Sequence, residues 1–111
     1  MSDWPGSFNE QRATPLAPLE NIAYAVARGP IGGPAWHPEE AVGVEEALVA
    51  YTRTPAYASY EEDRKGMLSD GMLADLAVLS RDILAANAEE IHRTKVEATI
   101  LGGRVIFGEL R

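Results

Sequence analysis

Hydrophobic residues at helical spacing mark the first half of the chain, and an alternating pattern marks the second half. A helix is predicted over about 18–28, with Pro18 in its first turn and Gly29 at its end. Its apolar stripe is formed by Leu19, Ile22, Ala23 and Val26. Residues 29–38, GPIGGPAWHP, are too rich in glycine and proline for regular structure and predict a surface loop.

A second helix is predicted to begin after Gly43, which serves as its N-cap. Its buried stripe consists of Ala47, Leu48 and Tyr51. Thr54 and Pro55 then predict a short third helix, with Thr54 as the N-cap and Pro55 as the first helical residue. Pro55 has no N–H group, so a single unbroken helix would lose a hydrogen bond at that position.

Short strands and turns are predicted beyond residue 65. One strand is placed at 67–68, and a second over 75–80 contains a continuous apolar run. Asp75 follows a glycine-containing turn, so its carboxylate is expected to accept backbone N–H bonds there. Asn87 is the expected cap of a helix of one or two turns in NAEEIHRT.

The end of the chain predicts a β-hairpin. Apolar and polar residues alternate over 95–100, which is typical of a half-buried strand. Gly102 and Gly103 form a two-residue turn, and residues 105–107 form the return strand. About four short strands are thus predicted, and their edges have no obvious partners. They are expected to be part of a sheet rather than a whole one.

Composition limits the possible function classes. The 111 residues suit one domain, and 46% of them are hydrophobic, which is typical of a globular protein. A net charge of −7 disfavours nucleic-acid binding. The absence of cysteine excludes disulfides, thiolate nucleophiles and zinc held by cysteine, and it fits a cytoplasmic protein. We expect no membrane span and no signal peptide, because no apolar run approaches about 20 residues and the N-terminus lacks a basic stretch.

The first residues, MSDWPGSF, raise a question that composition does not answer. Pro5 forces Trp4 into an extended conformation, so Ser-Asp-Trp-Pro is typical of a strand that ends in a functional loop. Only Met1 and Ser2 precede Asp3, which leaves no room for that strand.

Five segments in order resemble the C-terminal end of a metal-dependent amidohydrolase of amidohydrolase family 3, in the metallo-dependent hydrolase superfamily. SDWP matches the Gly-Ser-Asp-x-Pro signature at the last barrel strand of that family. The other segments are PLAPLENIAYAVAR, VEEALVAYTRTPAYASYEED, KGMLSDGMLADLAVLSRD and VEATILGGRVIF. No single motif is specific, but the order and spacing of all five are, and they cover essentially the whole chain. Met72 departs from the lysine usual in the fourth segment, which is expected to alter only a surface contact.

The resemblance implies an α+β fragment. Residues 1–60 would be the last loop and the closing helices of a (β/α)8 barrel, the TIM-barrel fold. Residues 61–111 would be the C-terminal part of a small composite β-sandwich. In this family the sandwich also takes strands from the N-terminal end of the chain, which would explain the unpaired strand edges. Met1 replaces the glycine of the signature, so the chain is expected to lack the upstream barrel.

The resemblance implies that Asp3 is the catalytic general acid/base, close to the metal at the mouth of the eighth barrel strand. The implied cofactor is a divalent metal ion, with zinc as the expected ion. No metal is expected to bind this chain alone, because one carboxylate cannot replace three or four ligands. The family's ligands include a His-x-His pair, a lysine or glutamate and further histidines; His37 and His92 do not lie in matching positions.

Each candidate residue also has a structural interpretation. Asp3 in this chain alone would be a solvated terminal aspartate. Trp4, Trp36 and His37 are candidates for the substrate pocket, but the pattern also fits an exposed loop histidine and tryptophans that pack in a core or an interface. His92 has Glu89 one helical turn before it, which is only half a ligand set. The glycine-containing segments lack the context of a phosphate-binding loop, which excludes a nucleotide site.

The sequence is therefore compatible with two functions. The first is the C-terminal portion of a metal-dependent hydrolase that acts on non-peptide carbon–nitrogen bonds of amides and is inactive as an isolated chain. The alternative is a non-catalytic module whose exposed apolar faces drive self-association or docking onto another chain. The expected partners are the missing barrel portion, another chain or a second copy, and neither nucleic acid nor a membrane. A chain without a selected role is a third possibility that the sequence does not separate from the second.

Overall fold

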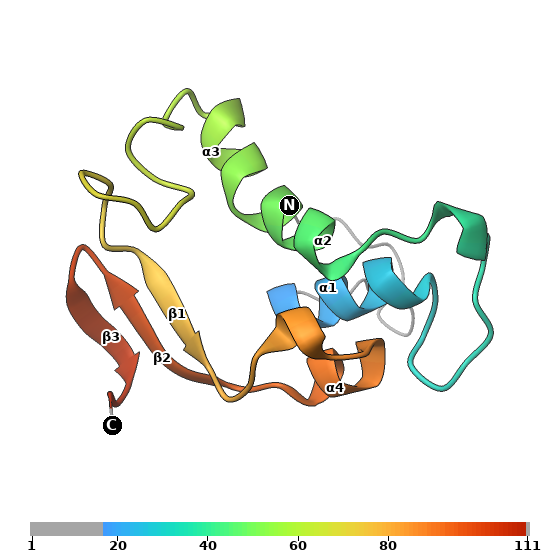
Figure 1. The fold of residues 1–111 in the computed structure, drawn as a ribbon. Helices are drawn as coiled ribbons and strands as arrows, with labels where there is room; N and C mark the ends of the chain where they lie inside the picture. The colour runs from blue at the N-terminus through green and yellow to red at the C-terminus, as the bar shows by residue number, and fades with distance from the viewer. Residues whose placement is uncertain (1–16, 111) are drawn as a thin grey trace, which may run out of the picture.

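The computed structural model describes residues 17–110, which form an α+β structure with a helical body beside a three-stranded antiparallel sheet (Figure 1). The elements are α1 (Pro18–Ala27), η2 (Pro38–Glu40), α2 (Val44–Tyr51), α3 (Arg53–Ala58), β1 (Leu76–Leu79), η3 (Ile83–Ala85), α4 (Ala88–Arg93), β2 (Val96–Leu101) and β3 (Arg104–Gly108). The predicted α+β class is confirmed at this level.

Helix α1 begins at Pro18, whose fixed φ suits the first helical position. It ends one residue earlier than predicted, because Arg28 adopts a left-handed conformation with φ 55° and donates its backbone N–H to Tyr24 O. Gly29 comes next and is buried. A Cβ atom there would lie 2.5 Å from the carbonyl oxygen of Pro34, so this glycine permits a close approach of two backbone segments.

The break between α2 and α3 lies at Thr52, and the prediction that Thr54 caps the third helix is wrong. Gly43 is the N-cap of α2, as predicted. The Thr52 hydroxyl donates to Leu48 O at 2.7 Å, so this residue remains tied to the preceding helix while its backbone turns. Pro55 is the third residue of α3, a position where a missing N–H has little cost because the first turn has no intrahelical acceptors.

Strand order in the sheet is β1-β2-β3, and β2 pairs with both neighbours. Gly102 and Gly103 have φ of 58° and 81°, which is the backbone that a two-residue hairpin turn requires. Asp75 accepts the N–H of Gly102 at 2.8 Å, so its predicted role as a backbone acceptor is confirmed. This bond attaches the tip of the hairpin to the start of β1.

The predicted strand at 67–68 is wrong, because residues 59–75 form turns and bends. Leu73 donates its N–H to Arg64 O at 2.7 Å, which closes the segment on itself instead of placing it beside a strand. Three strands therefore form the sheet of the described chain, not four.

The core lies in the helical body, where α1 packs against α2 and α4. Its buried members are Ile22, Ala23, Ala47, Ile83 and Ile91. Ile91 is 0% exposed and is the largest fully buried side chain of the described residues. Asn87 caps α4 through a capping box with Glu90, as the sequence predicts, and so holds Ile91 in the first turns of a short helix.

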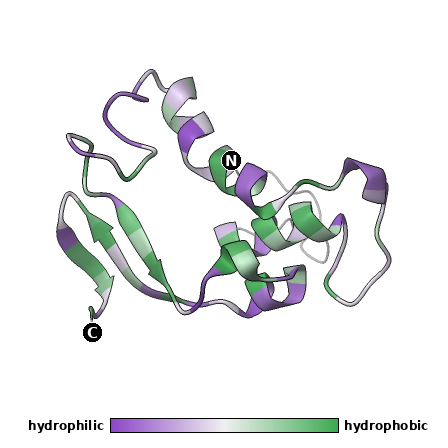
Figure 2. Ribbon diagram, in the orientation of Figure 1, coloured by the Kyte–Doolittle hydropathy of each residue, from purple (hydrophilic) through white to green (hydrophobic). Residues whose placement is uncertain are grey.

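The sheet lacks a comparable core. All five residues of β3 are exposed, and Figure 2 shows hydrophobic residues along the strands. The exposed apolar residues at this end of the chain, together named the β3 patch below, are Leu101, Val105, Ile106, Phe107 and Leu110, with exposed fractions of 45–61%.

Candidate functional site

Asp3 and Trp4 lie outside the described residues, so their predicted roles stay predictions. Among residues 17–110, no group of three or more His, Cys, Asp or Glu side chains is arranged to hold a metal ion. The described residues therefore do not fit a metal centre of their own, and no chemical step follows from them.

His37 lies in the loop between α1 and α2, in a left-handed conformation with φ 49°. Its Nδ1 donates to Glu39 Oε1 at 2.8 Å, and its side chain is 53% exposed. A hydrogen bond from its own backbone N–H, the bond from His37 and the charge of Arg28 together hold the pKa of Glu39 below its usual range. Glu39 is thus held in its carboxylate form beside the imidazole.

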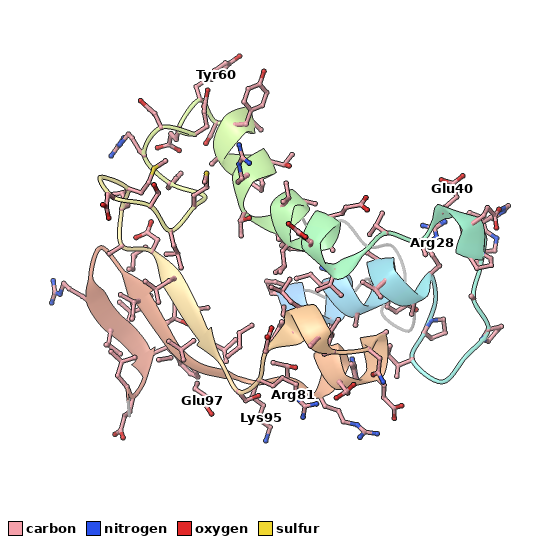
Figure 3. All side chains as sticks on the ribbon, viewed as in Figure 1. Arg28, Glu40, Tyr60, Arg81, Lys95 and Glu97 are labelled. Carbon is pink, nitrogen blue, oxygen red and sulfur yellow. The ribbon has the colours of Figure 1, made fainter. Side chains whose placement is uncertain are left out.

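Arg28 and Trp36 complete this cluster, and we call residues Arg28, Trp36, His37 and Glu39 the loop cluster. The Arg28 guanidinium lies over the Trp36 ring at 5.3 Å from its centroid, and Arg28 Nε donates to His37 O at 3.4 Å. The Trp36 and His37 rings meet edge to face with centroids 4.3 Å apart. Figure 3 shows Arg28 at the start of this loop, after α1, and Glu40 near its end, before α2.

Sequence reasoning singled out His37 and Trp36 but missed Arg28. The only sequence signal was an arginine at the end of a helix, followed by a proline- and glycine-rich loop with a tryptophan. That pattern does not predict that Arg28 folds back onto Trp36, eight positions later.

His92 is exposed on α4 and is not part of a ligand set within the described chain. Glu89, its expected neighbour, instead accepts a hydrogen bond from Arg93 on the same helix. This geometry agrees with the structural interpretation of His92.

A groove of about 720 Å³ lies between α2–α3 and β1. Its lining is mostly apolar and includes Leu48, Tyr51, Pro55, Met67, Leu76 and Leu79. Two charged residues also line it: Asp75, which binds Gly102, and Lys65, whose Nζ lies 2.6 Å from Glu61 Oε2. The bonds that Glu61 accepts from Lys65 and Ser59 lower the pKa of Glu61. Both charged groups of the groove are therefore already engaged, Asp75 in a hydrogen bond and Lys65 in an ion pair.

Comparison of the sequence with known proteins shows the class to which this chain belongs. The sequence profile described as the amidohydrolase family matches residues 11–107, so the chain is a member of the amidohydrolase family. The predicted resemblance is confirmed.

Three individual relatives are similar to most of this chain, and each of them is much longer than it. The chain is 37% identical over 87 residues to the N-substituted formamide deformylase of Arthrobacter pascens, which covers 78% of this chain and 16% of that protein. It is 31% identical over 96 residues to YtcJ of Bacillus subtilis, covering 84% of this chain and 18% of the relative. It is 33% identical over 107 residues to the protein LONG AFTER FAR-RED 3 of Arabidopsis thaliana, covering 96% and 17%. The chain thus spans less than a fifth of each relative's length, and no solved structure matches it significantly.

Proposed function

We propose that this chain supplies the C-terminal portion of a metal-dependent hydrolase that acts on non-peptide carbon–nitrogen bonds of amides. The observation that carries the proposal is the family match over residues 11–107 in a chain that spans 16–18% of its relatives. One of those relatives is named as a deformylase of N-substituted formamides. Residues 1–60 would close the barrel domain, and residues 61–111 would contribute to the composite β-sandwich.

In the proposed enzyme Asp3 is the catalytic carboxylate of this chain, and it takes up and returns a proton at the reacting amide. Trp4 and His37 are proposed to face the substrate. The divalent metal, zinc in this proposal, supplies Lewis acidity when bound and is held by residues outside this chain. The described residues hold no cluster for that metal, so the proposal requires the upstream portion.

We expect the purified 111-residue chain to show no metal-dependent hydrolysis of an N-substituted formamide. A chimera in which the matching C-terminal part of the Arthrobacter deformylase is replaced by this chain should be active. Asp3→Asn in that chimera should lower kcat by about 10²–10⁴-fold, the usual contribution of a positioned acid/base. The measurement is steady-state kinetics with and without added zinc.

Asp70→Asn is the matched control, because Asp70 is an exposed aspartate in a turn segment and should leave the rate unchanged. Turnover by the isolated chain that disappears in Asp3→Asn would contradict the inactive-fragment proposal. An Asp3→Asn chimera as active as the unchanged chimera would contradict the catalytic role.

A second candidate function is favoured by the β3 patch. Burial of apolar surface contributes about 25 cal/mol per Å², so a patch of several hundred Å² would stabilise an assembly by several kcal/mol. We propose that this patch docks against the upstream barrel portion, another chain or a second copy. No role for nucleic acid or a membrane is proposed: the net charge is −7, and within the described residues no helix is long and apolar enough to cross a bilayer. A cytoplasmic location fits this proposal.

If the isolated chain associates through the patch, its apparent mass in sedimentation velocity should rise with concentration. Ile106 lies in β3 and is 61% exposed. Ile106→Lys should raise the dissociation constant for self-association at least tenfold, because burial of the lysine charge in the interface is costly. Tyr60→Lys is the matched control, since Tyr60 is 90% exposed outside the sheet. A monomer at every concentration, or equal effects of both substitutions, would contradict self-association through β3.

A further inference from the structure

The loop cluster borders a second, smaller hollow, which Arg28 and Trp36 line but His37 does not. This hollow has a volume of about 300 Å³ and is lined by Tyr24, Arg28, Pro30, Pro34 and Trp36, among others. Its volume is at the lower end of the range for small-molecule sites. Tyr24 is 43% exposed and Trp36 is 69% exposed, so two aromatic rings stand at a hollow walled by two prolines.

The loop that forms the hollow is held in a defined shape. Arg28 and His37 both have positive φ, which non-glycine residues adopt rarely. Four contacts retain this shape: Trp36 N–H to Arg28 O at 2.7 Å, Glu40 N–H to His37 O at 2.9 Å, His37 to Glu39, and Arg28 to His37 O. The lining residues are therefore already positioned, and a ligand would not have to order them.

The guanidinium gives the hollow its chemical character. Arg28 Nε is bonded to His37 O, but within residues 17–110 the two terminal nitrogens of Arg28 form no hydrogen bond and no ion pair within 4.0 Å. The carboxylate of Glu39 is held by His37, although its charge still feels Arg28. A planar guanidinium with free donors beside an aromatic face recognises a planar carboxylate.

We propose that this hollow is a binding site for a small carboxylate that carries a flat apolar group. The carboxylate would accept hydrogen bonds from the terminal nitrogens of Arg28, and the flat group would lie between Tyr24, the prolines and Trp36. A phosphate dianion is disfavoured because Glu39 and Glu40 lie on the same loop and the chain is acidic. His37 does not line this hollow, and the test measures binding alone, so it does not depend on the proposed hydrolysis.

Phenylacetate is the probe, acetate supplies the charge without the ring, and 2-phenylethanol supplies the ring without the charge. Binding is followed on the indole N–H signal of Trp36 in the ¹⁵N-labelled chain, identified by its loss in Trp36→Phe. Phenylacetate should shift the signal saturably with a dissociation constant on the order of 1 mM, as expected for a ligand of this size. Both partial probes should bind at least tenfold more weakly.

Arg28→Gly removes the guanidinium and should weaken phenylacetate binding at least tenfold, while glycine adopts the left-handed backbone at no steric cost. Arg28→Asn is a second variant that also tolerates this backbone and should behave alike. Arg53→Gln, on α3 outside the loop, is the control and should bind as the unchanged chain does. The proposal is overturned if no saturable shift occurs, if 2-phenylethanol matches phenylacetate, or if either Arg28 variant retains the affinity.

Discussion

Replacement of Ile91 by alanine is expected to lower the free energy of unfolding by about 2–5 kcal/mol, the range for truncation of a large buried aliphatic residue. Ile91 is 0% exposed and belongs to the cluster in which α4 packs against α1. Its neighbours in that cluster include two alanines, Ala23 and Ala47, whose short side chains cannot extend into the cavity that the truncation leaves. Urea unfolding followed by circular dichroism measures the effect.

Leu84→Ala is the matched control for this prediction. Leu84 lies in η3, close to α4 along the chain, but it is 62% exposed, so its truncation should change stability by less than about 1 kcal/mol. Equal losses from the two substitutions would show that the helical body is not packed around Ile91.

Gly66→Ala is also expected to destabilise the chain strongly, for two reasons, and comparison with Gly71→Ala separates them. Both glycines have positive φ, 95° and 86°, so alanine strains the backbone at either position by about 1–3 kcal/mol. Only at Gly66 would the new Cβ also meet neighbours, at 2.9 Å from Ala56 Cβ and 3.0 Å from Thr52 O. The Cβ at Gly71 would meet nothing within 4 Å.

The difference between the two variants therefore reports the contact of the 59–75 segment with α3. We expect Gly66→Ala to be less stable than Gly71→Ala by about 1–3 kcal/mol, the usual cost of overpacking. Ala56 is 3% exposed and cannot move without disturbing α3. Equal stabilities by urea unfolding would mean that this segment does not pack against α3 in solution.

Local signals in the sequence predicted most helix positions. Pro18 and Gly43 mark the starts of α1 and α2, and Asn87 caps α4, because proline geometry and capping bonds act between residues near one another in sequence. The Gly102-Gly103 turn likewise places the hairpin. The error at Thr54 has a local cause too: Thr52 competes as the helix break through its bond to Leu48 O.

The candidate site was less predictable. Asp3 lies outside residues 11–107, which the family profile matches, and outside the described residues, so its catalytic role stays a prediction. His37 stood out in the sequence because it lies in a loop rich in glycine and proline. Arg28 did not, because no periodic pattern predicts that a residue at the end of a helix contacts the Trp36 ring eight positions later. The sequence predicted that Asp75 accepts a backbone N–H, but it did not predict that the donor is Gly102, 27 residues away.

The sequence by itself determined the family and the α+β composition. It also determined the starts of α1, α2 and α4 and the hairpin turn, since these depend on short-range sterics, capping and turn chemistry. Only the tertiary structure decided that Arg28 covers Trp36, that Gly66 packs against α3, and that β3 remains exposed at the edge of the sheet. Those features arise when elements distant in sequence are brought together by burial of the helical core. Apolar spacing favours such burial without specifying which surfaces meet.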